Sequence, residues 1–269
     1  MTSFNTAPTA TSLRTWWQKF LLLTLLVAGA FATGASAQTV TIGSGTSTSS
    51  YLPMYNYYGY NYTQQIYTAA QIGQAGKIDK IRFMVNAGGL VNGNSWVVYM
   101  GNTTKTTFAT TTDWVPLASM TQVYSGTLST APPITPLWME ITLTTPFVYN
   151  GTDNLVIAVD ENTSGYTSGT TWRAFASGTN TGIYYYNDTN NPDPASPPTA
   201  SSRSGTIAQL QLNFLPPCVG VPTAGSIPAS TPACIGSTVL LTATGGTVAD
   251  GLTYQWIESP NGLSPWVPV

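Results

Sequence analysis

Two carboxylates directly follow a short apolar run near the middle of the chain. Residues 155–159 form an unbroken apolar run rich in β-branched side chains, and Asp160 and Glu161 come immediately after it. Such a run is too short for an ordinary helix and indicates a central strand that is buried on both faces. Because a carboxylate cannot enter a core without partners, the loop that Asp160 and Glu161 open is the first candidate for a site.

A second loop, which follows Tyr186, is also rich in oxygen ligands. It contains Asp188, Asp193 and the asparagines at positions 187, 190 and 191. Calcium takes roughly six to eight oxygen ligands in irregular loops, so Asp160, Glu161, Asp188 and Asp193 together are candidate calcium ligands. Their spacing matches no EF-hand, and the more ordinary interpretation is that these acids form Asx turns or face solvent.

Tyrosine is concentrated between residues 51 and 67, in the first quarter of the chain. Alternate residues of a strand point to the same side, so Tyr58, Tyr60 and Tyr62 would form a row on one face. An exposed row of this kind suits a sugar ring or another protein. The more ordinary interpretation is that the rings cover the edge of a core, because tyrosine fits half-buried strand positions well.

The side chains available for catalysis are few. The chain has no histidine, which removes the commonest general base and the commonest zinc ligand. One carboxylate pair, Glu140 with Asp160 or Glu161, has the residue types that a glycosidase uses. Glu140 lies between two apolar residues of an alternating segment and is expected to face solvent. We therefore expect no catalytic site and no enzymatic activity.

Composition points to an ordered all-β protein. Only 7% of the residues are charged, against about 25% in ordinary soluble domains, but 12% are aromatic. Disordered chains lack aromatic and β-branched residues, so disorder is not expected. Short alternating segments separated by turn residues, without a long helix, predict an antiparallel, jelly-roll-like β-sandwich over residues 38–217. The predicted strands include 81–85, 95–100, 122–127, 138–143, 154–159, 171–177, 182–186 and 206–214, and Asp113 is predicted to cap a short helical turn.

The first 37 residues have the features of a secretory signal peptide. Arg14 and Lys19 precede an apolar segment, and Ala35, Ser36 and Ala37 form the small-residue pattern at which signal peptidase cuts. The apolar segment is shorter than the roughly 18 to 20 residues that a membrane span needs. We therefore expect a secreted or cell-surface protein with no membrane span in the mature chain.

The charge of the predicted mature chain also limits its partners. Residues 38–269 contain six basic and ten acidic side chains, a formal net charge of −4. A surface of this sign does not attract nucleic acid or anionic membranes.

Five segments of the predicted sandwich carry a family resemblance: 62–69, 98–103, 112–115, 145–150 and 154–162. They resemble a recurrent N-terminal β-sandwich module of large secreted bacterial surface proteins, which are often exported by the type IX route. The resemblance spans nearly all of residues 38–217. It implies a role in display or adhesion, and it implies no reaction.

Residues 218–269 are predicted to begin a second domain. Segments 239–243 and 252–256 alternate between apolar and polar residues on either side of an Asp250-Gly251 turn. With Cys234 before the first segment and Trp256 in the second, they resemble the early half of an Ig-like domain. Only about half of the roughly 100 residues that such a domain needs are present, so we expect a partial Ig-like domain belonging to a longer protein.

The two cysteines leave two pairings open. Cys218 and Cys234 would close a small loop through a disulfide, as two cysteines in a secreted chain usually do. In a full Ig-like domain, Cys234 would instead pair with a cysteine on a later strand, which this sequence does not contain.

These observations support two functions from different classes. The first is a non-catalytic, adhesin-like protein whose sandwich binds a glycan or an extracellular protein, with calcium as its one candidate cofactor. The second is a structural stalk or spacer that presents further domains, and an accessory domain of a secreted hydrolase is a third, less favoured interpretation. Exposed aromatic rings beside an acidic loop favour the first function, and burial of those rings favours the second.

The order of charged, apolar and small-residue segments at the N-terminus predicts cleavage after Ala37. Protein recovered from outside the cell should therefore begin at Gln38 when its N-terminus is sequenced. Exported protein that still begins at Met1 would contradict the prediction.

Overall fold

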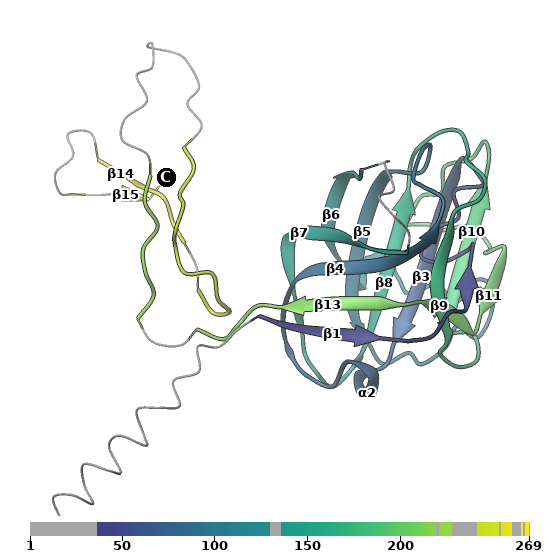
Figure 1. The fold of residues 1–269 in the computed structure, drawn as a ribbon, viewed down its shortest axis with the longest axis horizontal. Coiled ribbons are helices and arrows are strands. Elements are labelled where there is room, and N and C mark those ends of the chain that lie inside the picture. The colour runs from purple at the N-terminus through teal and green to yellow at the C-terminus, as the bar shows by residue number, and fades with distance from the viewer. Residues whose placement is uncertain are drawn as a thin grey trace, which may run out of the picture.

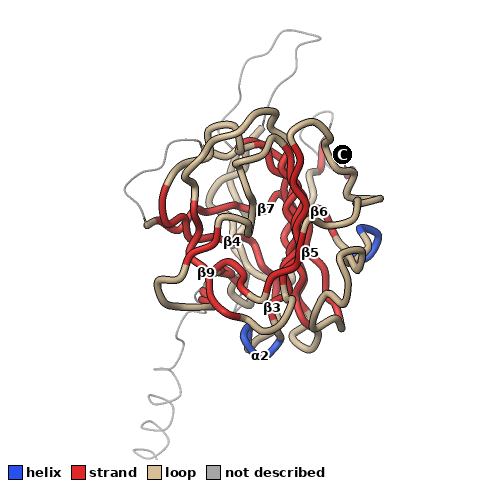
Figure 2. Tube along the Cα trace, turned by 90° about the vertical axis from the view of Figure 1, so that its right-hand side faces the viewer, coloured by secondary structure: helices blue, strands red, loops and turns tan. Residues whose placement is uncertain are grey.

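Two antiparallel β-sheets packed face to face make up almost all of the regular structure between residues 38 and 214 (Figure 1). The structure is a computed structural model, and it describes residues 37–129, 136–218, 221–227, 241–252, 254–259, 265 and 267–268. Figure 2 separates the layer that contains β4, β7 and β9 from the layer that contains β3, β5 and β6. The predicted all-β sandwich is confirmed.

The first sheet has seven strands in the order β1-β13-β4-β9-β12, with β7 paired to β4 and β2 paired to β9. Their bounds are β1 Gln38–Ile42, β2 Thr48–Ser49, β4 Gly76–Ala87, β7 Leu137–Tyr149, β9 Thr171–Ala176, β12 Thr206–Ala208 and β13 Leu210–Phe214.

The second sheet has six strands in the order β11-β10-β3-β8-β5-β6. Their bounds are β3 Tyr60–Tyr67, β5 Ser95–Thr103, β6 Thr121–Thr127, β8 Asn154–Glu161, β10 Gly182–Asn187 and β11 Ser202–Ser204. One helical turn, α2 Ala69–Ile72, follows β3, and a short 3-10 helix, η1 Leu117–Ser119, precedes β6. Among the described residues, no helix has both the length and the apolar character needed to cross a bilayer.

Strand β8 lies in the middle of the second sheet, between β3 and β5. Leu155, Ile157 and Val159 belong to the core between the two sheets, whereas Val156 and Ala158 belong to a second apolar cluster on the outer face. The apolar run at 155–159 is therefore a strand buried on both faces, as its composition predicts.

The outer face of β8 is covered by two long connections rather than by a third sheet. Phe108, Trp114 and Val115 come from the segment between β5 and β6, and Ala200 comes from the segment between β10 and β11. The Trp114 indole Nε1 donates to the Pro198 carbonyl at 2.9 Å, which ties the two covering segments together.

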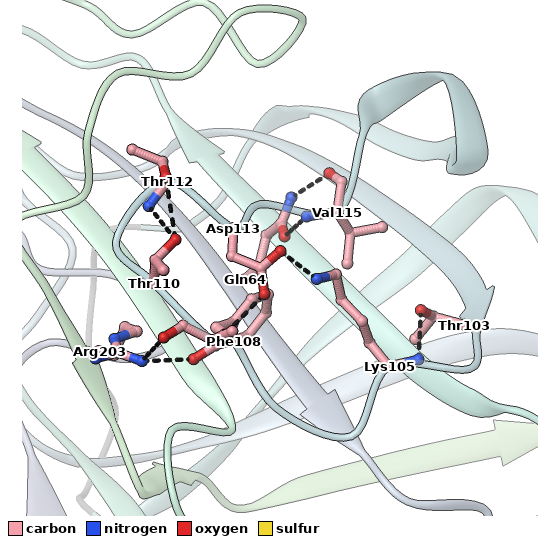
Figure 3. Close-up of polar contacts among 10 residues, drawn as sticks. Gln64, Thr103, Lys105, Phe108, Thr110, Thr112, Asp113, Val115 and Arg203 are labelled. Carbon is pink, nitrogen blue, oxygen red and sulfur yellow. Dashed lines mark hydrogen bonds and ion pairs between the residues drawn. The ribbon is translucent and has the colours of Figure 1, made fainter.

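Gln64 fixes the first of these segments to the sheet (Figure 3). Its Oε1 accepts from the Val115 backbone N–H at 2.8 Å, and its Nε2 donates to the Val115 carbonyl at 2.9 Å. The neighbouring Gln65 points to the other face of β3, where its Oε1 accepts from the Ala208 N–H at 2.8 Å. Both glutamines are buried, so each replaces water as the hydrogen-bonding partner of a buried backbone group.

Asp113 does not cap a helical turn, contrary to the prediction. Its Oδ2 accepts from the Ala109 N–H at 2.7 Å, and its Oδ1 pairs with the Lys105 ammonium group (Figure 3). The short helix η1 begins later, after Pro116, without a side-chain cap. The aspartate instead closes the loop that carries Phe108 and Trp114 across the outer face.

The C-terminal region contains only short pairings in its described parts. β14 Ile257–Glu258 pairs with β15 Val267–Pro268, and the backbones of Ser226 and Thr244 exchange hydrogen bonds. Tyr254 and Trp256 are exposed, and residues 254–256 do not form the predicted strand. Cys218 is exposed, while Cys234 and the predicted signal peptide up to residue 36 lie outside the described residues. The Ig-like assignment and the disulfide stay predictions.

The contacts of Gln64 predict a large effect of its replacement. In Gln64→Leu, the N–H and the carbonyl of Val115 would both lose their buried partner, so we expect a loss of about 2–4 kcal/mol in the free energy of unfolding. Urea denaturation monitored by tryptophan fluorescence measures this loss. Gln122→Leu, at an exposed position on β6, is the matched control and should change stability little. Equal effects of the two substitutions would contradict the assignment.

Candidate functional site

Seven tyrosines gather at one end of the sandwich, and we call them the tyrosine cluster. They are Tyr51, Tyr55, Tyr57, Tyr58, Tyr166, Tyr184 and Tyr186. Ring centroids are 4.3 Å apart for Tyr58 and Tyr186 and 4.8 Å apart for Tyr51 and Tyr184, both pairs being stacked. Such contacts hold the rings in fixed orientations.

The cluster combines an exposed surface with a buried base. Tyr51, Tyr57 and Tyr166 are 40%, 47% and 62% exposed, whereas Tyr184 is only 9% exposed. The exposed rings are connected, because Tyr57 lies 5.8 Å from Tyr166 and reaches Tyr51 through Tyr55. Exposed rings held together in this way form a site rather than scattered surface residues.

Three separate parts of the chain bring the cluster together. The loop before β3 supplies four of the tyrosines, β10 supplies Tyr184 and Tyr186 from the same strand face, and the loop between β8 and β9 supplies Tyr166. The Asn61 side chain accepts from the Tyr55 N–H at 3.4 Å and donates to the Tyr55 carbonyl at 3.3 Å. These two bonds fasten the tyrosine-rich loop to the start of β3.

Gly59 allows the loops to approach one another closely. Its N–H donates to Asp188 Oδ1 at 3.3 Å. A Cβ atom at this position would lie 3.1 Å from the Asp188 carbonyl oxygen and 3.3 Å from the Gly165 nitrogen. A larger residue would therefore push apart the loops that carry Tyr58, Tyr166 and Tyr186. This close approach places Asp188 beside the tyrosine cluster.

The predicted row of three tyrosines is not formed. Tyr58 belongs to the tyrosine cluster and Tyr60 is half-buried, but Tyr62 is fully buried on the outer face of β3, 5.1 Å from the Trp114 ring. Burial raises the pKa of the Tyr62 phenol well above its ordinary value. The expectation for Tyr62 is wrong because the segment that carries Trp114 covers the face that the sequence left open.

Glu161 and Asp160 point to opposite faces of β8, since they are consecutive strand residues. Glu161 is fully buried; its Oε1 accepts from the Thr163 N–H at 2.7 Å, and its Oε2 accepts from Asn61 Nδ2 at 3.5 Å. Burial raises the pKa of the Glu161 carboxyl to about 7. No cation contributes to this value, so ionising Glu161 opposes folding.

Asp160 lies on the outer face and is 5% exposed. Its Oδ2 accepts from Asn162 Nδ2 at 2.9 Å, while its Oδ1 is buried without a hydrogen-bond partner among the described residues. Burial, with a smaller contribution from the charge of Asp193, raises the pKa of the Asp160 carboxyl to about 6.

The four carboxylates predicted to hold calcium do not form a single site. Glu161 faces the interior, Asp188 contacts Gly59, and only Asp193 lies near Asp160. In the part of the chain that the structure describes, no three His, Cys, Asp or Glu side chains are grouped as metal ligands. The prediction failed because the two faces of β8 separate its adjacent acids.

The loop after β10 does contain the expected Asx turn, in which Asn187 Oδ1 accepts from the N–H groups of residues 189 and 190 at 2.8 Å each.

The carboxylate pair considered for a glycosidase is not brought together either. Glu140 lies on β7 in the first sheet, where it pairs with Lys80 at 2.9 Å and with Arg82 at 2.5 Å. These two cations lower the pKa of the Glu140 carboxyl, with the Lys80 hydrogen bond as the largest cause. Asp160 and Glu161 belong to the second sheet, so the structure does not bring Glu140 together with either of them.

Comparison of the chain with protein-family models, curated proteins and solved structures finds no match. The resemblance to a module of secreted surface proteins therefore stays a prediction. Three tyrosines of the cluster, Tyr166, Tyr184 and Tyr186, were not predicted, because they are distant in sequence from the tyrosine-rich stretch at 51–67. The one local signal is the run of three tyrosines at 184–186, in which alternate residues share a strand face.

The raised pKa values of Asp160 and Glu161 predict that stability falls as pH rises. Both carboxyls bind protons more tightly in the folded chain than at their ordinary pKa values of 3.8 and 4.5. Their charged forms therefore disfavour folding as pH passes from about 4 to about 7. Between pH 5 and pH 8, in buffer free of divalent cations, we expect the free energy of unfolding to fall by about 2–4 kcal/mol.

Glu161→Gln should remove much of this pH dependence and should raise stability at pH 8. Glu140→Gln is the control, since Glu140 is exposed and its pKa is shifted in the opposite direction. Chemical denaturation at a series of pH values gives the comparison. An unchanged pH dependence in Glu161→Gln would show that ionisation of Glu161 does not lower the free energy of unfolding.

Proposed function

We propose that this protein is a non-catalytic, adhesin-like binding protein of the cell surface or extracellular space, and that it binds glycans through the tyrosine cluster. The observation that carries the proposal is the continuous, partly exposed array of rings formed by Tyr51, Tyr57 and Tyr166 with their stacked neighbours. The sequence features of a signal peptide and the resemblance to secreted surface modules support the location.

The chemistry of the cluster suits a sugar. A pyranose ring has a face of C–H groups and a rim of hydroxyls, and a tyrosine ring offers a flat apolar face with a hydroxyl at its edge. Because ring contacts and the Asn61 bonds already fix the aromatic side chains, little conformational freedom is lost when a ligand binds. Asp188, beside Gly59, supplies a carboxylate at the border of the cluster that accepts hydrogen bonds from sugar hydroxyls.

The basic side chains do not favour a phosphate-bearing ligand at this surface. Lys80 and Arg82 pair with Glu140 in the other sheet, and Lys105 pairs with Asp113. The guanidinium groups of Arg173 and Arg203 donate to backbone carbonyls at Thr46 and at Phe108 and Ala109. A neutral glycan therefore fits the surroundings of the cluster better than a nucleic acid does.

A structural spacer is the second candidate function. The burial of Tyr62, Tyr67 and Tyr149 supports it, since these tyrosines serve packing and internal hydrogen bonds. The predicted start of an Ig-like domain after residue 217 supports it as well, because a chain of such domains needs a folded first unit. In this case the exposed rings would bind nothing specific.

A glycan array separates the two functions. A single tyrosine platform is expected to bind weakly, so the protein is displayed on a multivalent particle to raise its apparent affinity. The triple variant Tyr51→Ala, Tyr57→Ala and Tyr166→Ala should lose at least about tenfold in binding, the equivalent of about 1.4 kcal/mol. The control Tyr254→Ala removes an exposed tyrosine outside the cluster and should bind as the parent does.

Two outcomes would decide against the proposal. Binding that survives the triple substitution, in a variant with unchanged circular dichroism, would place the site elsewhere on the protein. Absence of binding to every neutral glycan by the folded parent would favour the spacer.

A further inference from the structure

The end of β8 holds a buried carboxylate whose charge is not balanced by any described side chain. Asp160 is 5% exposed, and its Oδ1 has no hydrogen-bond partner in the part of the chain that the structure describes. The ion pairs found among the described residues involve Glu140 and Asp113, not Asp160. A buried carboxylate oxygen without a partner is costly, so something absent from the protein itself is expected to meet it.

The loop after β10 is held against this end of β8. Asn162 Nδ2 donates to Asp160 Oδ2 at 2.9 Å, and Asn191 Nδ2 donates to Asn162 Oδ1 at 2.6 Å. This relay of amides fixes Asn191 close to Asp160. Asp193 follows two residues later, and its Oδ1 accepts from the Ala195 N–H at 2.9 Å. Asp193 is exposed, and its Oδ2 has no hydrogen bond among the described residues, so this oxygen is open to solvent.

A tyrosine of the neighbouring strand lies on the same outer face of the sheet as Asp160. Tyr99 is on β5, which pairs with β8, and its ring packs on the outer apolar cluster. Burial is the largest cause that raises the pKa of the Tyr99 hydroxyl, and the charges of Asp160 and Asp193 raise it further. Asp160 and Tyr99 therefore share the outer face of adjacent strands, and the bond between Asn191 and Asn162 brings the loop that carries Asp193 to the same place.

We propose that Asp160 and Asp193 bind a hydrated divalent cation of the hard, oxygen-preferring class. Two carboxylates with retained water molecules are a usual way to hold such an ion. The ion would give Asp160 Oδ1 its missing partner and would turn the repulsion between the two aspartates into shared attraction. Calcium and magnesium share this chemistry, and the experiment tests them separately.

This site differs from the one that the sequence suggested. It excludes Glu161, which faces the interior, and Asp188, which contacts Gly59. An ion between Asp160 and Asp193 would fasten the loop after β10 to the sheet, and the same loop carries Asp188 to the tyrosine cluster. The proposed ion site does not depend on glycan binding.

Thermal unfolding and titration calorimetry of the purified protein test the proposal. After treatment with a chelator and its removal, calcium chloride or magnesium chloride is added in separate titrations. We expect one or both ions to raise the Tm in proportion to the logarithm of their concentration above Kd. Asp160→Asn and Asp193→Asn should each weaken ion binding at least about tenfold, since each removes a charged ligand. Asp188→Asn, on the same loop, is the matched control and should bind the ion as the parent does.

The two asparagine variants are nearly the same size as the parent side chains, and circular dichroism confirms that they fold. A response to calcium alone or to magnesium alone supports the site and identifies its preferred ion. Absence of any response in the folded parent would overturn the proposal and would indicate that a proton, rather than a metal ion, neutralises Asp160. Loss of the response in Asp188→Asn with retention in Asp160→Asn would also overturn it.

Discussion

Covering the second sheet on both faces is the constraint on which the rest of this structure depends. Strands β3 and β8 carry side chains into the core between the sheets and into a second apolar cluster outside. The outer cover is irregular chain, whose backbone groups need hydrogen-bond partners once they are buried. Gln64 meets this need for Val115, and Gln65 does the same for Ala208 on the other side. Two adjacent glutamines thus join the three layers.

The same constraint accounts for the unusual side chains at the end of β8. Because both faces of the strand are covered, Asp160 and Glu161 become buried where the apolar run ends. Neither receives a cation from the protein, and burial raises the pKa of both carboxyls. Retaining such residues lowers stability, and this is the usual sign that a site serves a role other than folding. The loops that continue from this end of the sheet also assemble the tyrosine cluster.

The local pattern of apolar and polar residues predicted the strands correctly, but it did not predict which side chains are exposed. The apolar run at 155–159 predicted a strand covered on both faces, since its composition directly reflects its surroundings. It could not reveal what covers the outer face, so the sequence left open whether Tyr62 is exposed or covers a core, and the structure shows it buried. Asp113 looked like a helix cap but bonds backward to Ala109, a choice set by the loop that crosses the sheet.

The candidate site depends on contacts between distant parts of the chain, which single-sequence patterns do not report. Tyr58 was identified among its neighbours, but its stacking partner Tyr186 lies on another strand, 4.3 Å away between ring centroids. The paired use of Asp160 and Asp193 likewise depends on how Asn191 meets Asn162. The alternation of residues along a strand predicts which side chains share a face. Which faces contact each other depends on the fold, and a single sequence does not show it.

The central claim is that the exposed rings of the tyrosine cluster contact a glycan. Nuclear magnetic resonance of the protein labelled with ¹³C in its tyrosine rings tests it directly, during titration with neutral oligosaccharides. The account predicts that ring signals of Tyr51, Tyr57 and Tyr166 shift together and saturate, while those of the buried Tyr62 and Tyr67 stay unchanged. Saturable shifts confined to other tyrosines, or no shift with any oligosaccharide tested, would contradict it.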